Sequence, residues 1–365
     1  ADMTATATVR VVPRMDVLLC RCPTRAGWVF VEKARSGPRK GSLDRAPSHI
    51  RPSTPCDASL TARRDPIVTF PPRPAAVQPS HRRGGAPRAR PFATVWLVSG
   101  FDTHFDDDLR LAHALADEVE AITLPRFRAQ DLRVEAKPDL TLVSDADRSG
   151  EELIRAQLAR VRPRDAVLGE EFAPTGDGPR QWIVDPIDGT HNYVRGVPVW
   201  ATLIGLAVDA EMVLGLVAAP ALRRRWWAAR GTGAWAGRSL TSASAIQVSQ
   251  VSRLADASLS LASWTSWDAF GRTEALLDLA RDCWRQRAYG DFWSYMLLAE
   301  GAVDIATEPE LGLYDMAALV PIVTEAGGRF TSLRGEDGPW GGNALATNGL
   351  LHDEVLERIG FTTAS

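Results

Sequence analysis

The stretch Asp185-Pro186-Ile187-Asp188-Gly189-Thr190 decides the fold predicted for this chain. It follows an apolar run at residues 182–184, which is typical of a short β-strand. Pro186 lacks an N–H donor and fixes φ, so we expect the strand to end there. Gly189 permits a tight turn, and Thr190 is suited to begin a helix. Because such a turn directs two carboxylates and the carbonyl between them toward one point, beside free helical N–H groups, it predicts a site for a metal ion and a phosphate.

Two further acidic motifs lie on either side of this turn in the sequence. Gly169-Glu170-Glu171 follows the apolar run at residues 166–168, and Tyr314-Asp315 opens a predicted helix that ends in Glu325-Ala326-Gly327-Gly328. Taken alone, each acid is also compatible with a solvated surface charge or a helix cap, and Asp315 especially so. The whole set is better explained by Mg²⁺, which takes hard oxygen ligands and binds substrate phosphate.

Helices and strands alternate from about residue 103 onward. Apolar residues recur at helical spacing, or in short strand-like runs bounded by turn residues. The helices are predicted at residues 106–122, 151–160, 274–284, 293–301, 316–326 and 352–359. The strands are predicted at residues 200–208, 212–218, 225–229, 234–240, 258–262, 303–306, 330–333 and 344–347, besides 182–184. This mixture predicts a layered α/β architecture.

The first quarter of the chain differs in composition from the rest. Residues 1–97 contain 17 Lys and Arg against 6 Asp and Glu, and the remainder contains 25 against 39. Thirteen of the 24 prolines also precede residue 98. Residues 35–55 and 71–91 lack any sustained period, so we expect a basic, disordered extension at 1–97 and a folded domain at 98–365.

Three interpretations of the extension remain open. Its charge is compatible with a nucleic-acid-binding tail, although arginine without interleaved aromatic residues is a weak signal. An Arg-rich segment poor in acids is also typical of an organellar transit peptide. The interpretation that we favour is a segment that takes no part in the fold.

Cysteine usage and hydropathy bear on the compartment. Only Cys283 lies in the domain, so a disulfide cannot staple it, and we expect a reduced, cytoplasmic protein. No apolar run approaches the ~20 residues that cross a bilayer. Residues 11–20 are too short and too interrupted for a secretory signal.

Taken together, these motifs resemble the signatures of the inositol-monophosphatase-like superfamily. Residues 185–190 resemble its Asp-Pro-Ile-Asp-Gly-Thr signature, residues 169–171 its Gly-Glu-Glu element, and residues 315–328 its Trp-Asp…Glu-Ala-Gly-Gly signature, with Tyr314 in place of Trp. Lys137-Pro138-Asp139 and residues 144–147 resemble a fourth element, with Leu142 where proline is common. The motifs occur in the family's order over about residues 105–359.

The resemblance implies a layered α-β-α-β-α sandwich, with a metal- and phosphate-binding half at residues 98–240 and a substrate-side half at 241–365. It also implies two or three Mg²⁺ ions. By position, the carboxylates of Glu170 and Asp185 and the carbonyl of Ile187 hold the first ion. Asp185, Asp188 and Asp315 hold the second.

The resemblance also assigns the phosphate and water contacts. The backbone of Gly189 and Thr190 binds the phosphate. Thr190, paired with Asp147, and Glu170 position and deprotonate a water for in-line attack. This chemistry is physically reasonable in itself, because phosphoryl transfer needs positioning and charge neutralisation more than covalent help. His191 follows Thr190 where the family varies, and we do not expect it to act as a base.

Two acids between the signatures indicate the substrate. Asp291 and Glu308 match positions that in the family face the organic part of the substrate, and two acids there would suit a cationic group. This arrangement resembles bacterial, actinobacterial-type histidinol-phosphate phosphatases, as do residues 197–200 and 225–230. Histidinol carries an amine and an imidazole, so histidinol phosphate is the substrate that we predict. A helix-capping Asp291 and a rim-exposed Glu308 are the structural alternative.

Two other functions remain open. One is a phosphatase for inositol phosphate, fructose bisphosphate or a phosphoadenosine nucleotide, which uses the same metals. The other is a catalytically idle binding protein whose basic tail engages nucleic acid; the complete set of expected carboxylates argues against it. The resemblance further implies a homodimer and inhibition by Li⁺.

Overall fold

The structure is a computed structural model that describes residues 9–11, 17–21, 28–32, 105–137 and 141–360. The chain divides into two compact units, residues 1–89 and 90–365. In the first unit, β1 (Val9–Val11), β2 (Val17–Arg21) and β3 (Trp28–Glu32) form an antiparallel sheet in that order. These strands were not among the predicted elements. The disorder that we predicted for residues 1–97 was inferred from residues 35–55 and 71–91, which lie outside the described residues.

The second unit is built around a seven-stranded sheet with the order β12-β11-β10-β9-β8-β7-β6. Neighbouring strands are antiparallel except β6 and β7, which are parallel. The strands are β6 (Ala166–Gly169), β7 (Arg180–Asp188), β8 (Ala201–Val208), β9 (Glu211–Ala219), β10 (Arg224–Ala229), β11 (Ala234–Ser239) and β12 (Ser242–Ile246). The central strands are apolar and buried on both faces, so helices must cover the sheet on each side.

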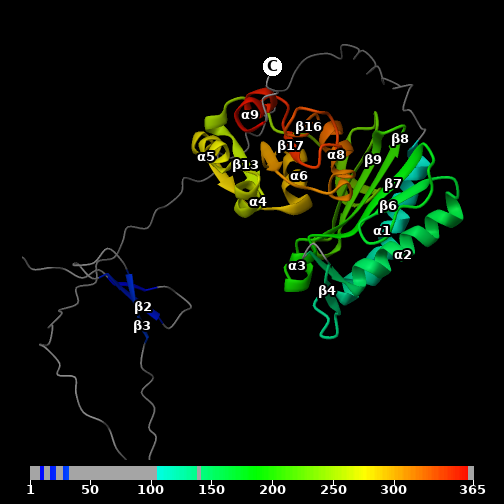
Figure 1. Cartoon of the computed structure of the whole chain (residues 1–365), viewed down its shortest axis with the longest axis horizontal. Coiled ribbons are helices and arrows are strands. Elements are labelled where there is room, and N and C mark those ends of the chain that lie inside the picture. The colour runs from blue at the N-terminus through cyan, green and yellow to red at the C-terminus, as the bar shows by residue number, and fades with distance from the viewer. Residues whose placement is uncertain (1–8, 12–16, 22–27, 33–104, 138–140, 361–365) are drawn as a thin grey trace, which may run out of the picture. The chain divides into compact units, whose positions relative to one another are not determined.

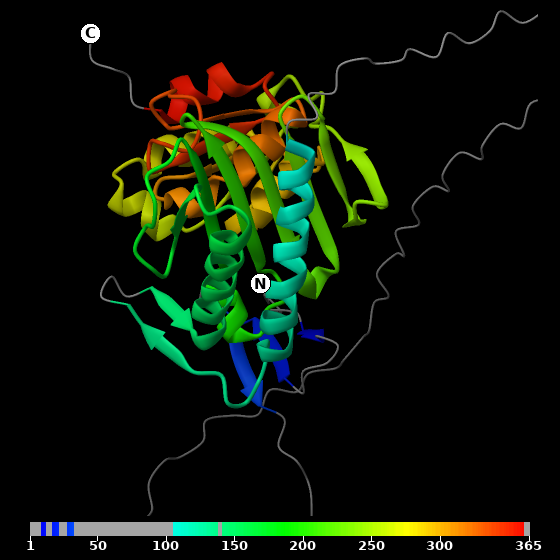
Figure 2. The same ribbon diagram turned by 90° about the vertical axis from the view of Figure 1, so that its right-hand side faces the viewer.

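Two long helices, α1 (Asp106–Arg126) and α2 (Asp145–Val161), lie side by side on one face of this sheet (Figure 2). Both begin with acids in the first turn, which favour the helix dipole, and Ser144 and Asp147 form a capping box for α2. The apolar face of α1, including Leu115 and Val119, packs on Trp182 and its neighbours in the sheet.

The opposite face of the sheet carries α6 (Asp291–Ala299) and α8 (Leu319–Glu325), and a second sheet lies beyond them (Figure 1). Its order is β14-β13-β15-β17-β16, and α4 (Trp264–Ala269), α5 (Thr273–Asp282) and α9 (His352–Ile359) cover its outer face. The strands are β13 (Ser258–Leu261), β14 (Arg285–Arg287), β15 (Ile305–Glu308), β16 (Arg329–Thr331) and β17 (Ala344–Thr347). This α-β-α-β-α order confirms the predicted fold class.

The helices between the sheets approach the large sheet closely at two glycines. A Cβ atom at Gly215 would lie 2.0 Å from the Ala318 carbonyl oxygen, and one at Gly205 would lie 3.0 Å from Ala317. Glycine in β8 and β9 therefore lets the chain just before α8 rest on the sheet. This contact also sets the position of the preceding α7 (Leu313–Met316), which carries Asp315.

The prediction that a strand ends at Pro186 is wrong. β7 continues to Asp188, with an irregular register between Asp185 and Asp188, where pairing resumes with Ala201. The Thr202 hydroxyl donates a 2.8 Å hydrogen bond to the Pro186 carbonyl and holds the irregular segment to β8. A strand tolerates proline at such an irregularity because the missing N–H is not needed by the ladder there.

Other boundaries differ in detail. The helix predicted at residues 274–284 ends at Asp282, and the one at 316–326 is two helices, α7 and α8. The remaining elements are the hairpin β4 (Val134–Ala136) and β5 (Leu142–Ser144), helix α3 (Thr190–Arg195) and two short 3₁₀ turns, η2 (Pro220–Leu222) and η3 (Leu254–Asp256). Among the described residues, no helix is both long enough and apolar enough to cross a membrane.

Candidate metal and phosphate site

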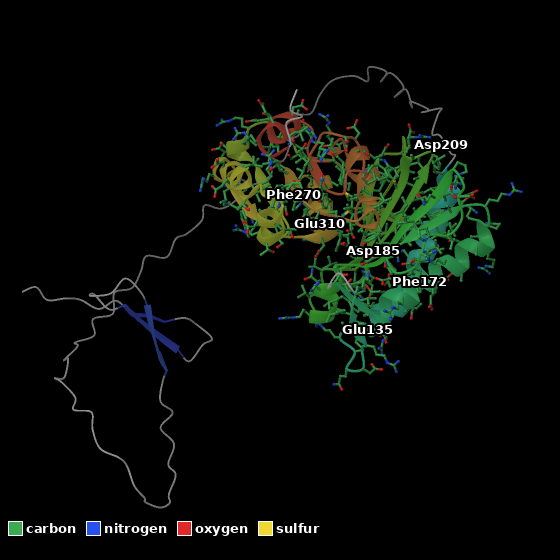
Figure 3. The ribbon with its side chains drawn as sticks, in the orientation of Figure 1. Glu135, Phe172, Asp185, Asp209, Phe270 and Glu310 are labelled. Atoms are coloured by element: carbon green, nitrogen blue, oxygen red, sulfur yellow. The ribbon has the colours of Figure 1, made fainter. Side chains whose placement is uncertain are left out.

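All predicted site residues except Asp147 line one cavity of about 230 Å³, to which both halves of the domain contribute. Figure 3 shows Asp185 where the seven-stranded sheet meets the carboxy-terminal half. The irregular end of β7 supplies Asp185 and Asp188, and α7 supplies Asp315. The cavity is also lined by Glu170, Ile187, Gly189, Thr190, Asp291, Glu308 and Tyr314.

Asp185, Asp188 and Asp315 form a three-carboxylate cluster. One oxygen from each lies within 4.8 Å of the others. Among the described residues, these are the three acids that lie close enough together to share one cation. Backbone N–H groups orient two of the side chains: Ile187 donates to Asp185 Oδ1 at 2.9 Å, and Gly312 donates to Asp315 Oδ2 at 2.7 Å.

The electrostatics of this cluster fit a divalent cation. Burial, followed by repulsion from Glu170 and Asp188, raises the pKa of Asp185 well above its usual range. Burial also raises the pKa of Asp315 to about 7. Ionised carboxylates this close together in a buried place need a positive partner, and hard oxygen donors suit a hard divalent ion. The residues therefore fit the metal that the sequence predicts.

Glu170, the fourth expected side-chain ligand, lines the cavity but is not part of the three-carboxylate cluster. Its Oε1 accepts a 2.7 Å hydrogen bond from Lys137 Nζ, which also donates to Glu171 Oε1 at 2.8 Å. Lys137 belongs to the segment between β4 and β5 that resembles the family's lysine element. This contact places a positive charge beside the acid that we expect to act on water.

Sequence reasoning missed the importance of Glu151, which is fully buried in α2. Its carboxylate accepts hydrogen bonds from the backbone of Glu171 at 2.7 Å and of Phe172 at 3.3 Å, and from Arg155 Nε at 2.7 Å. A Cβ atom at Gly169 would lie 2.1 Å from Glu151 Oε1, so glycine is required there. From sequence, Glu151 and Arg155 look like an ordinary surface pair at i,i+4 spacing.

Asp147 and Thr190 meet as expected. The Thr190 hydroxyl lies 3.2 Å from Asp147 Oδ1 and 3.0 Å from the Ile187 carbonyl. Asp147 is fully buried, and its Oδ2 accepts a 2.9 Å hydrogen bond from the Ser144 N–H. Burial raises the pKa of Asp147 to about 6. Gly189 has φ +81° and caps α3, as the tight turn requires.

Asp291 and Glu308 both face this cavity. Asp291 opens α6 with φ +50°, a left-handed conformation that is strained for a residue with a side chain, and its Oδ2 accepts a 2.9 Å hydrogen bond from Asn192 Nδ2. Glu308 ends β15 and is 6% exposed, so it is not a rim charge. Burial raises the pKa of both acids, that of Glu308 well above its usual range.

Glu325, in the second signature, has a structural role. Its carboxylate accepts 2.8 Å hydrogen bonds from the backbone N–H groups of Gly231 and Gly233. It therefore fixes the turn between β10 and β11. His191 also lines the cavity, but it does not belong to the three-carboxylate cluster.

Comparison with known proteins agrees with this geometry. The sequence profile described as "Inositol monophosphatase family" matches residues 106–362. The chain is 62% identical over 254 residues to a histidinol-phosphatase of Streptomyces coelicolor, which covers 68% of this chain and 96% of that protein. It is 58% identical over 255 residues to a histidinol-phosphatase of Mycobacterium tuberculosis, which covers 69% of this chain and 98% of that protein.

Solved structures give the same result. An inositol monophosphatase from Zymomonas mobilis aligns with a TM-score of 0.62 at 30% identity, over 70% of this chain and 98% of that one. The Thermotoga maritima IMPase aligns with a TM-score of 0.62 at 28% identity, over 69% of this chain and 96% of that one. From the profile that matches residues 106–362 and the relatives that are 58% and 62% identical, this chain belongs to the inositol monophosphatase family.

Proposed function

We propose that this protein is a Mg²⁺-dependent histidinol-phosphatase, which hydrolyses histidinol phosphate to histidinol and phosphate. The observation that carries the proposal is that one cavity contains both a group of carboxylates suited to metal ions and two further acids suited to a cationic substrate group. The three-carboxylate cluster fits metal ions, and Asp291 and Glu308 add two more acids from α6 and β15. The two relatives at 58% and 62% identity carry the same activity in their names.

Asp185, Asp188 and Asp315 would hold one Mg²⁺, and Asp185, Glu170 and the Ile187 carbonyl another. When bound, such ions lower the pKa of a water and neutralise charge on the phosphoryl group. Lys137 Nζ donates to Glu170 Oε1 at 2.7 Å, and because a carboxylate has lone pairs on both oxygens, Glu170 could keep this bond and still bind the ion.

The chain's own groups position the attacking water. The Thr190 hydroxyl proton points to Asp147 Oδ1 or to the Ile187 carbonyl, so its oxygen lone pairs are free to accept a hydrogen bond from water. Glu170 is the carboxylate that takes the water's proton. Glu151 holds the following backbone of Glu171, which keeps Glu170 in place.

The other end of the cavity selects the leaving group. The amine and imidazole of histidinol are cationic or donate hydrogen bonds, and Asp291 and Glu308 are acceptors that lie inside the cavity. The uncharged hydroxyl groups of inositol gain less from such acids, because hydrogen bonds between two charged groups are the stronger ones.

A homodimer and inhibition by Li⁺ are further proposals that rest on the family resemblance, and a cytoplasmic location is a proposal that rests on the single cysteine of the domain. The nucleic-acid-binding alternative gains no support from the described residues, since it depends on the basic extension.

The test is a comparison of kcat/KM for histidinol phosphate and inositol 1-phosphate, with Mg²⁺ and with EDTA. We expect a clear preference for histidinol phosphate and no turnover in EDTA. Preference for the inositol ester would disprove the substrate and leave the metal site standing. Full turnover in EDTA would disprove the metal mechanism.

A further inference from the structure

A second cavity, of about 580 Å³, lies outside the catalytic site and shares no lining residue with it. Its walls come from the second half of α1, from the η2 turn and from strands β10 and β11. This volume is within the usual range for small-molecule sites, roughly 300–1,000 Å³. Neither the metal cluster nor the substrate acids use it.

Four arginines line this cavity: Arg223, Arg224, Arg225 and Arg238. Two of them are occupied. The Arg225 guanidinium, on a residue 8% exposed, bonds Asp117 Oδ1 at 2.6 Å and Glu120 Oε2 at 2.9 Å. Arg224 pairs with Glu300 at 2.6 Å.

Arg223 and Arg238 have no ion-pair partner within 4.0 Å among the residues that the structure describes. Both are exposed, and the wall of the cavity has four arginines against two acids, Asp117 and Glu120, which both pair with Arg225. The wall therefore keeps positive charge, although residues 98–365 as a whole carry more acids than bases.

Both free arginines also stand at irregular backbone positions. Arg223 ends η2 with φ +55°, which costs free energy for any residue with a Cβ atom. Arg238 lies between Gly237 and Ser239, where the register of β11 against β12 shifts. Such a bulge changes the direction in which a side chain points. Two separate irregularities thus bring unpaired guanidinium groups to one cavity.

We propose that this cavity is a second, non-catalytic binding site for a small organic phosphate. Guanidinium groups present planar sets of donors that match phosphate oxygens, and two of them match a dianionic phosphate monoester. Leu124, Pro125 and Pro220 supply an apolar surface for the organic part of such a ligand.

The probe is phenyl phosphate, titrated calorimetrically into the full chain in EDTA at constant ionic strength. Without metal, the catalytic carboxylates repel the probe and do not hydrolyse it. We expect saturable binding to one site per chain. The double variant Arg223→Gly with Arg238→Gln should bind at least ~10-fold more weakly, a loss of about 1.4 kcal/mol. Glycine adopts the left-handed conformation at position 223 without strain, so this variant should fold.

The matched control is Arg253→Gln with Arg281→Gln, which removes two exposed arginines elsewhere on the domain. It should bind the probe like the wild type, and sulfate should bind the wild type more weakly than phenyl phosphate. No saturable binding, or equal weakening in the control, would overturn the proposal. Equal affinity for sulfate would mean an adventitious ion only and would also overturn it.

Discussion

Asp188 Oδ2 accepts a 2.8 Å hydrogen bond from the backbone N–H of Phe292, 104 positions further along the chain. This bond ties the metal-binding turn at the end of β7 to the first turn of α6. The neighbouring residue, Asp291, is thereby fixed beside the metal cluster. One carboxylate thus serves both the expected metal and the geometry of the substrate end of the cavity.

The first prediction follows from that double role. Asp188→Asn keeps an oxygen to accept from Phe292 but removes an anionic ligand, so the fold should survive while kcat falls by several orders of magnitude. Steady-state assays at saturating Mg²⁺ measure it. Near-normal activity there would disprove the metal assignment.

The effect of Mg²⁺ on the melting temperature tests the same metal assignment without measuring turnover. Ligand binding to the native state raises stability, by about 2.7 kcal/mol at 100 times Kd. Mg²⁺ should therefore raise the melting temperature of the wild type and do so much less for Asp188→Asn. In EDTA the variant should melt at or above the wild-type temperature, because one buried charge is gone.

The second prediction concerns selectivity at Asp291. A charge-assisted hydrogen bond contributes roughly 1.5–3 kcal/mol. Asp291→Asn should therefore lower kcat/KM for histidinol phosphate by about 10- to 100-fold. Its hydrolysis of p-nitrophenyl phosphate, an aryl ester whose organic part has no cationic group, should barely change. Equal losses on both esters would show that Asp291 only caps α6.

The third prediction concerns Glu151, which holds the backbone after Glu170. Glu151→Gln weakens its bonds to Arg155 and to the Glu171 N–H, and we expect a loss of about 10- to 100-fold in Mg²⁺ affinity or in kcat. The dependence of rate on Mg²⁺ concentration separates the two. Glu152→Gln, the exposed neighbour on the same helix, is the control and should behave like the wild type.

The fourth prediction concerns stability in acid. Burial lowers the pKa of His113 to about 4, while its unfolded pKa is about 6.5. Between these values the unfolded chain binds the proton and the native chain does not, so stability falls as pH drops from about 6.5 toward 4, by up to about 3 kcal/mol. His352, also buried and with a pKa lowered to about 4, adds a similar loss.

His113→Phe tests this. The His113 ring packs edge-on against Trp227 with centroids 4.8 Å apart, and phenylalanine can keep that contact without titrating. Urea unfolding at pH 7 and pH 5 should show a smaller loss of stability in the variant. An unchanged pH dependence would mean that His113 is not buried in its neutral form.

The fifth prediction concerns the extension. Deleting residues 1–97 should leave melting temperature and kcat/KM essentially unchanged, since the family match begins at residue 106 and residues 1–89 form a compact unit of their own. A large loss in either measurement would show that the extension is part of the domain.

Local sequence rules worked where a feature depends on neighbours in the chain. The positive φ of Gly189, the start of α3 at Thr190 and the bounds of α9 follow from turn and helix preferences within a few residues. They were wrong at Pro186, because the irregular register of β7 is stabilised by Thr202 on the adjacent strand.

The sequence by itself determined the layered α/β architecture and the family, and through that resemblance the five-layer fold and the candidate acids of the site, because apolar periodicity and the order and spacing of motifs are properties of the chain alone. Only the tertiary structure decided how those acids act together. In the folded protein Glu151 is buried next to the segment after Glu170, and Lys137 pairs with Glu170. Asp291 faces the cavity with a strained, left-handed backbone. These contacts join residues that are far apart in the chain, and their energies depend on burial and distance, which no local pattern records.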